Sequence, residues 1–140
     1  MLGSSLIAIF VFLALVHVYW ACGGRIAWVA AIPEVAGRAA FTPSKPMTFA
    51  VAFGLLLCAV LVGATAGIIP LPLPRIVLKW LSMGLALGLL LRAIGDFKLV
   101  GFFKRVRDTR FAKLDSYVYV PLCAMLAAAV FFVAWELRTE

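Results

Sequence analysis

The stretch LGSSLIAIFVFLALVHVYWAC, residues 2–22, contains no Lys, Arg, Asp or Glu, and its His17 is the only histidine in the chain. A helix of about 20 apolar residues spans the hydrocarbon core of a bilayer. The stretch lacks the basic start and the small-residue cleavage site that are typical of a secretory signal peptide. We therefore expect it to be retained as a membrane-spanning helix.

The composition of the whole chain is that of a membrane protein. Of its 140 residues, 66% are apolar and 14% are charged, whereas soluble domains average about 25% charged residues. One small core cannot cover so much apolar surface, so lipid must cover much of it. The net charge of +7 is explained by basic residues on the cytoplasmic side of a membrane protein, so nucleic acid is not an expected partner.

Three further segments match the first in length and apolarity. The expected spans are residues 2–22, 48–69, 76–94 and 118–135. No alternating strand pattern competes with these runs, so the predicted fold class is all-α. We expect a polytopic membrane protein in which residues 1–140 form a single four-transmembrane-helix bundle. Pro70, Pro72 and Pro74 separate the second span from the third, and because proline cannot continue a helix, these two spans should form a tight antiparallel hairpin.

The connection KLVGFFKRVRDTRFAKLD, residues 98–115, is the most charged part of the chain. Its apolar residues Leu99, Phe102, Phe103 and Val106 recur at helical spacing among basic ones. This pattern predicts a short amphipathic helix lying on the lipid surface.

The distribution of basic residues predicts the orientation. The first and third connections carry nine of them: Arg25, Arg38, Lys45, Lys98, Lys104, Arg105, Arg107, Arg110 and Lys113. The opposite side carries three: Arg75, Lys79 and Arg138. Because basic residues favour the cytoplasmic side, both termini should lie outside the cytoplasm.

Two GxxxG patterns occur in the second and third spans. They are formed by Gly63 with Gly67 and by Gly84 with Gly88. Small residues four positions apart let helices approach closely in lipid. They indicate either packing within one chain or the contact of a homodimer.

The titratable residues of the spans gather near the predicted cytoplasmic side. At 1.5 Å per residue, His17 lies about 22 Å down the first span and Arg92 about 24 Å down the third. Asp96 is one turn beyond Arg92, and Asp115 and Tyr117 open the fourth span from the same side. This convergence predicts a polar site just inside the membrane surface.

Arg92 and Asp96 are four positions apart, so they share a helix face and can pair. One interpretation is that Arg92 reaches toward the lipid head groups, with Asp96 balancing its charge and Gly95 ending the helix. The other is that both residues form a pocket wall shared with His17, because ionisable residues at membrane depth normally face the bundle interior.

His17 also has two interpretations. It is either a hydrogen-bonded packing residue or a residue that faces a ligand or exchanges protons, which imidazole does near neutral pH. Trp20, three residues on, shares its helix face. Tyr19 and Trp20 are either part of an interfacial aromatic belt or neighbours of the ligand. Pro121 predicts a late start or a kink in the fourth span.

The leading functional hypothesis is a non-enzymatic protein that binds a lipid or amphiphile, or passes a small solute, through this site. The candidate ligand-binding residues are His17, Tyr19, Trp20, Arg92, Asp96, Asp115 and Tyr117. One alternative is an enzyme that uses His17 with Asp96 or Asp115 as its acid/base pair. Another is a structural subunit of a larger membrane complex. Catalytic and phosphate-binding motifs are absent, and we expect neither a metal nor a cofactor, because the three cysteines form no CxxC pair.

Three segments carry a resemblance to a known family: HVYWACGG, IPEVAG and RAIGDFKLVGFFKRVRDTRFAKLDSYVYVPLC. Together they resemble a family of small bacterial integral membrane proteins known only as a domain of unknown function. The family pattern falls on His17, Tyr19, Trp20, Gly24, Arg92, Gly95, Asp96, Asp115, Tyr117 and Pro121. The resemblance implies four spans and no assigned activity. For a bacterial protein of this kind we expect a location in the inner (plasma) membrane.

Overall fold

The computed structural model describes residues 1–28, 31–35, 38–40, 42–95 and 97–138. Within them, four helices are long and apolar enough to cross a membrane. They are α1 (Leu2–Ala21), α2 (Lys45–Thr65), α3 (Arg75–Ile94) and a continuous helix, Arg110–Glu136, made of α4 (Arg110–Leu114), the π-helical turn η2 (Asp115–Tyr119) and α5 (Val120–Glu136). The predicted all-α class and the four spans are confirmed, and the chain is a multi-pass membrane protein.

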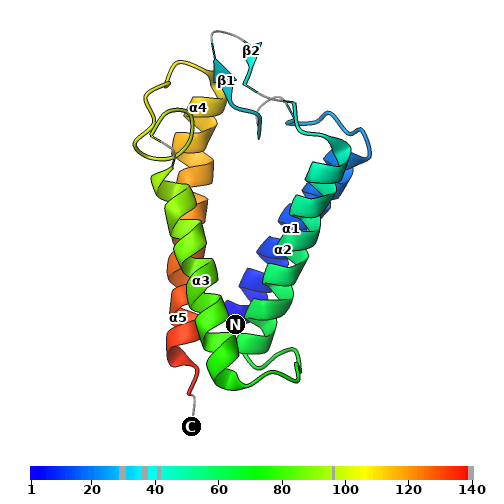
Figure 1. Ribbon diagram of the computed structural model, residues 1–140, viewed down its shortest axis with the longest axis vertical. Helices are drawn as coiled ribbons and strands as arrows, with labels where there is room; N and C mark the ends of the chain where they lie inside the picture. The colour runs from blue at the N-terminus through cyan, green and yellow to red at the C-terminus, as the bar shows by residue number, and fades with distance from the viewer. Residues whose placement is uncertain (29–30, 36–37, 41, 96, 139–140) are drawn as a thin grey trace.

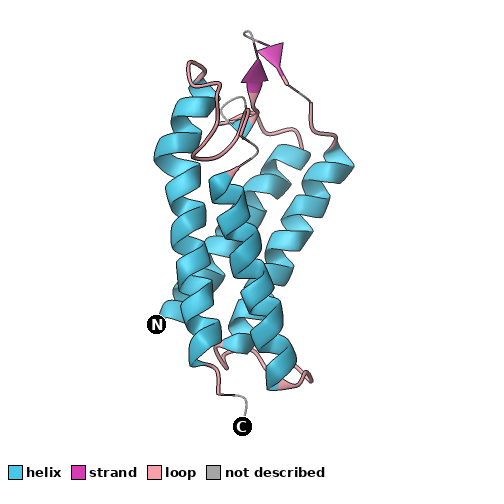
Figure 2. Cartoon of the chain, turned by 60° about the vertical axis from the view of Figure 1, so that its left-hand side comes forward, coloured by secondary structure: helices cyan, strands magenta, loops and turns pink. Residues whose placement is uncertain are grey.

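The four helices form two antiparallel pairs, α1 with α2 and α3 with α5 (Figure 1). The pairs converge at the end that holds both termini and the α2–α3 connection, and they separate toward the other end. That other end carries the α1–α2 and α3–α4 connections. We call it the basic end, because these connections together with the starts of α2 and α4 carry nine Lys and Arg residues. Two short antiparallel strands, β1 (Glu34–Val35) and β2 (Arg38–Ala39), stand beyond the helix ends there (Figure 2).

Where the two pairs meet, all four helices contribute to one apolar core. Its buried members are Leu6, Phe10, Ala59, Val62, Ala86, Leu126, Val130 and Val133. In the most apolar 18-residue stretch of each span, only 22–33% is buried inside the protein. Lipid must therefore cover most of the remaining apolar surface.

The two GxxxG patterns have different surroundings. A Cβ on Gly63 would lie 2.5 Å from Ile69 Cδ1 and 3.1 Å from Ile7 Cδ1, and Gly67 takes φ +71° in the turn after α2. Gly84 and Gly88 are exposed, and a Cβ on either would meet nothing within 4 Å. The first pattern thus serves packing and turning within the chain, while the second faces outward from α3.

The predicted amphipathic helix in the third connection is wrong. Residues 97–109 form bends and turns. Two glycines with positive φ, Gly95 at +90° and Gly101 at +94°, bring their backbones into contact, and Phe102 N donates to Ala93 O at 2.9 Å. The segment therefore folds back onto the end of α3, and it leaves Phe102 and Phe103 exposed.

The fourth span begins at Arg110 rather than near residue 118, because Thr109 caps α4 by accepting a hydrogen bond from Ala112 N at 3.1 Å. Pro121 does not break this helix. The π turn that precedes it lets Val120 N donate to Asp115 O, five residues back. A single π turn can absorb a residue that would otherwise disturb the α-helical ladder.

Candidate functional site

The basic end carries two separate groups of polar side chains. The Asp115 cluster, at the junction of α3, the third connection and η2, consists of Arg92, Gly101, Lys104, Asp115 and Ser116. The tryptophan cavity lies between the end of α1, the loop after it and the start of α2. We describe them in turn.

In the Asp115 cluster, one buried carboxylate is held from three directions. Arg92 Nη2 donates to Oδ1 at 3.0 Å, while Lys104 Nζ and Gly101 N donate to Oδ2 at 3.1 and 2.7 Å. Asp115 is 0% exposed. A buried carboxylate is stable only when it is paired and hydrogen-bonded, and both conditions are met here.

The ammonium group of Lys104 is as fully occupied as the carboxylate. Besides Asp115, its Nζ donates to Ser116 Oγ at 2.7 Å and to Gly101 O at 3.1 Å. An ammonium group has three protons to donate, so all three are used. Lys104 is 2% exposed, and its charge therefore fastens the third connection to the helices and is not available at the surface.

Arg92 is the partly exposed charged residue of this cluster. Its side chain is 37% exposed, and its Nη1 atom is buried with no hydrogen-bond partner among the described residues. Counted over the described residues, the cluster holds two cations and one carboxylate, which leaves one net positive charge.

The loop that follows α1 forms one side of the tryptophan cavity, and its course is set by the end of this helix. Gly23 takes φ +100°, and the amides of Gly23 and Gly24 donate to Trp20 O and Tyr19 O at 3.0 and 2.9 Å. Glycine with positive φ commonly ends a helix in this way. A Cβ on Gly24 would collide with the Tyr19 ring, so the absence of a side chain lets the loop fold back over the helix.

The folded-back loop brings the ring of Trp28 against that of Trp20, which also contacts the ring of His17 on α1. The His17 and Trp20 ring centroids are 5.1 Å apart, and those of Trp20 and Trp28 are 5.8 Å apart, both in edge-to-face geometry. Trp20 Nε1 donates to Ile26 O at 2.8 Å, and Tyr19 Oη accepts from Ile26 N at 3.5 Å. The side chains of Trp20 and Tyr19 therefore both hold the loop to α1.

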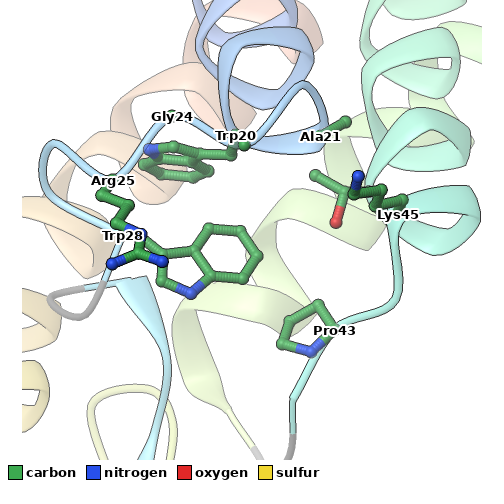
Figure 3. A pocket seen from close by; sticks show the side chains of 9 residues that line it. Trp20, Ala21, Gly24, Arg25, Trp28, Pro43 and Lys45 are labelled. Atoms are coloured by element: carbon green, nitrogen blue, oxygen red, sulfur yellow. The ribbon is translucent and has the colours of Figure 1, made fainter.

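The cavity beside these rings has a volume of about 510 Å³. Its lining includes Trp20, Arg25, Trp28, Pro43, Lys45 and Thr48. Figure 3 shows the two indole rings next to each other on the loop side, with Pro43 and Lys45 across from them. The described lining contains no Asp or Glu.

A second, smaller cavity of about 230 Å³ adjoins the first, since Trp20, Trp28, Pro43 and Thr48 line both. It adds His17 and the apolar side chains of Ile32, Met47 and Val51. The Nδ1 of His17 is 2.7 Å from Leu13 O, which favours the tautomer with the proton on Nδ1 and leaves Nε2 as an acceptor.

The structure places the predicted site residues in two groups. Arg92 contacts Asp115, and His17 contacts Trp20, with Tyr19 supporting the same loop. Among the described residues, no contact joins these two groups. Tyr117 is 82% exposed on the π turn, and Asp96 lies outside the described residues.

Four charged or aromatic residues of these sites were not predicted as members. Lys104 was counted as a surface cation, and nothing in its sequence neighbourhood signals its burial. Arg25, Trp28 and Lys45 lie on the long first connection or at its end, and only the folded loop brings them to Trp20. No group of three His, Cys, Asp or Glu side chains suited to a metal occurs among the described residues.

Comparison with known proteins gives one match. The model of a family described as "Protein of unknown function (DUF3995)" matches residues 10–130. No curated protein and no solved structure is significantly similar to the chain.

Proposed function

Since the chain belongs to the DUF3995 family, whose description assigns no activity, its function has to be inferred from its own residues, and we propose that it binds a lipid or lipid-like amphiphile without catalysing a reaction. The tryptophan cavity at the basic end is the proposed site. The observation that carries the proposal is an aromatic cavity of about 510 Å³ with cationic side chains at its edge.

The cavity has the two kinds of surface that an amphiphile needs. Trp20 and Trp28 offer ring faces to an apolar body, and the adjoining smaller cavity continues that surface toward Met47 and Val51 on α2. Arg25 and Lys45 offer polar contacts. Tryptophan favours the boundary between hydrocarbon and head groups, so a molecule held here would lie across that boundary.

The other predicted residues take supporting parts in this proposal. The Nε2 of His17 accepts a hydrogen bond from the ligand in the smaller cavity. The Asp115 cluster fixes the third connection to α3 and η2, and the partly exposed guanidinium of Arg92 remains able to meet an anionic group. The acid/base alternative has less support, because Asp115 already accepts hydrogen bonds from Arg92, Lys104 and Gly101 N, and no described contact joins Asp115 to His17.

We also propose that the basic end faces the cytoplasm of a bacterial cell, with the protein in the inner membrane and both termini outside. The two connections lie at the same end of the bundle (Figure 1). Together with the starts of α2 and α4 they carry nine basic residues, against three at the other end. Such a bias is what retains connections in the cytoplasm.

The test is native mass spectrometry of the protein released gently from lipid nanodiscs. Wild type is compared with Trp28→Ala, which removes one wall of the cavity, and with Trp80→Ala, which removes an indole that is 69% exposed on α3. We expect a discrete amphiphile adduct on wild type and on Trp80→Ala that is lost from Trp28→Ala. Identical adducts on all three proteins would contradict the proposal.

A structural role is the second candidate, and a specific observation favours it. Gly84 and Gly88 face outward with open space above them, so a second helix can approach α3 closely there. A homodimer would use this face. The Gly63/Gly67 face is less suitable, because Gly63 is already packed against Ile7 and Ile69. Gly84→Leu, which fills the open space, should abolish such a dimer in detergent or nanodiscs.

A further inference from the structure

Among the described residues, the lining of the tryptophan cavity carries two basic side chains and no acidic one. Arg25 and Lys45 both line it, both are exposed, and neither forms an ion pair among the described residues. The described lining contains no carboxylate that could balance them. This differs from the nearby Asp115 cluster, where one carboxylate is bound by two cations.

The start of α2 adds to this charge. Lys45 is the first residue of α2, a helix of 21 residues, and Thr48 in its first turn also lines the cavity. The N-terminal end of a helix carries a partial positive charge, because its backbone dipoles are aligned. In this first turn Pro46 has no amide proton, and Ser44 accepts hydrogen bonds from the amides of Met47 and Thr48 at 3.3 and 3.0 Å, so the helix contributes mainly through its dipole. The helix end and the two side chains therefore attract an anion to the same place.

We propose that the tryptophan cavity selects the phosphate-bearing head group of an anionic phospholipid. This inference rests on the proposed function and names the class of its ligand. The phosphate lies between Arg25 and Lys45 at the start of α2, and the adjacent glycerol and the first part of the chains lie against Trp20 and Trp28.

The same cavity disfavours the zwitterionic choline head group. Tryptophan rings do attract quaternary ammonium groups, and a cavity with the rings alone would accept choline. Here the two side-chain cations repel the ammonium group while they attract the phosphate. A head group with a net negative charge keeps the attraction without the repulsion.

The experiment measures tryptophan fluorescence in bilayers that contain brominated lipids, because bromine quenches a nearby indole. The background variant carries Trp80→Phe and Trp135→Phe, so that Trp20 and Trp28 are its remaining tryptophans. Quenching by brominated phosphatidylglycerol in a phosphatidylcholine bilayer is compared with the reverse labelling, which gives the relative affinity of the two lipids. We expect phosphatidylglycerol to be favoured by about fivefold for each basic residue that faces it.

Two double variants locate the preference. Arg25→Gln with Lys45→Gln should bring the relative affinity close to one, and the exposed side chains should leave the fold intact. Arg105→Gln with Lys113→Gln removes the same charges from the same end but outside the cavity lining, and it should leave the preference almost unchanged. Equal losses in both variants would overturn the proposal in favour of general surface charge.

Two further outcomes would overturn it in different ways. Relief of the quenching by inorganic phosphate would mean that a soluble anion, and not a lipid, is the ligand. Equal affinity of both lipids for the unaltered cavity would refute anionic selectivity, while the amphiphile adduct in mass spectrometry would still stand. Loss of that adduct would instead refute the proposed function itself.

Discussion

Lys104 and Lys45 have the same side chain and belong to the same end of the bundle, but their surroundings are opposite. Lys104 is 2% exposed and donates to a carboxylate, a hydroxyl and a carbonyl. Lys45 is exposed at the edge of a cavity and has no ion partner among the described residues. The first charge is used to hold the chain together, whereas the second remains available to a ligand.

The difference shows how a count of basic residues should be interpreted. Positive charge at one end of a membrane protein is usually attributed as a whole to its orientation. In this protein the charges of Arg92 and Lys104 are bound to Asp115, so they contribute to the fold. Arg25 and Lys45 are exposed, so a negatively charged group of a ligand can neutralise them.

Replacing Asp115 by Ala gives the largest expected effect, and it tests whether the buried charge of Lys104 supports the fold. The change leaves the buried ammonium of Lys104 without its counter-ion, and breaking a buried ion pair in this way costs about 3–5 kcal/mol. The measurement is chemical or thermal unfolding in detergent. Asp108→Ala is the control, because Asp108 is exposed and has no ion pair among the described residues. Equal unfolding midpoints for the two variants would mean that the Asp115 cluster does not support the fold.

Gly101→Ala should have the next largest effect, through the backbone of the same cluster. Gly101 has φ +94°, and a Cβ there would collide with Gly95 Cα and Ile94 O. We expect a loss of about 1–3 kcal/mol, because a strained backbone carries a cost of this size.

The control for this variant is Gly88→Ala in α3, where a Cβ meets nothing within 4 Å. Alanine is favoured over glycine in a helix by up to about 1 kcal/mol, so this variant should unfold at a higher denaturant concentration than wild type. A destabilised Gly88→Ala protein would instead indicate that another helix covers this face of α3.

The sequence predicted the architecture well because bilayer thickness leaves few choices for apolar runs of this length. It was less accurate at the helix ends. Residues 110–117 were excluded from the fourth span because they are polar, yet the helix includes them from its Thr109 cap onward. In the third connection, apolar residues at helical spacing suggested a helix, but spacing does not reveal that Gly95 and Gly101 take positive φ.

The candidate site was predicted only where a few residues of one helix determine the geometry. His17 and Trp20 share a face of α1 at a spacing of three, and their rings are in contact. The pairing of Arg92 with Asp115 depends on how α3 and η2 lie beside each other. The burial of Lys104 depends on a folded loop, and no local pattern encodes either feature.

The smallest expected effect on stability concerns the exposed charges of the tryptophan cavity. Replacing both Arg25 and Lys45 by Gln removes two charges, but it breaks no ion pair that the described residues form and exposes no apolar surface, because both side chains are already exposed. Substitutions of this kind usually change stability by less than about 0.5 kcal/mol. The unfolding midpoint of the variant in a neutral detergent should therefore match that of wild type. Added phosphatidylglycerol should raise the midpoint of wild type more than that of the variant, since a ligand stabilises the state that binds it.

A large loss of stability in the neutral detergent would mean that Arg25 and Lys45 hold the loop in place, as Lys104 does. The tryptophan cavity and the Asp115 cluster would then not differ in the way that their contacts indicate.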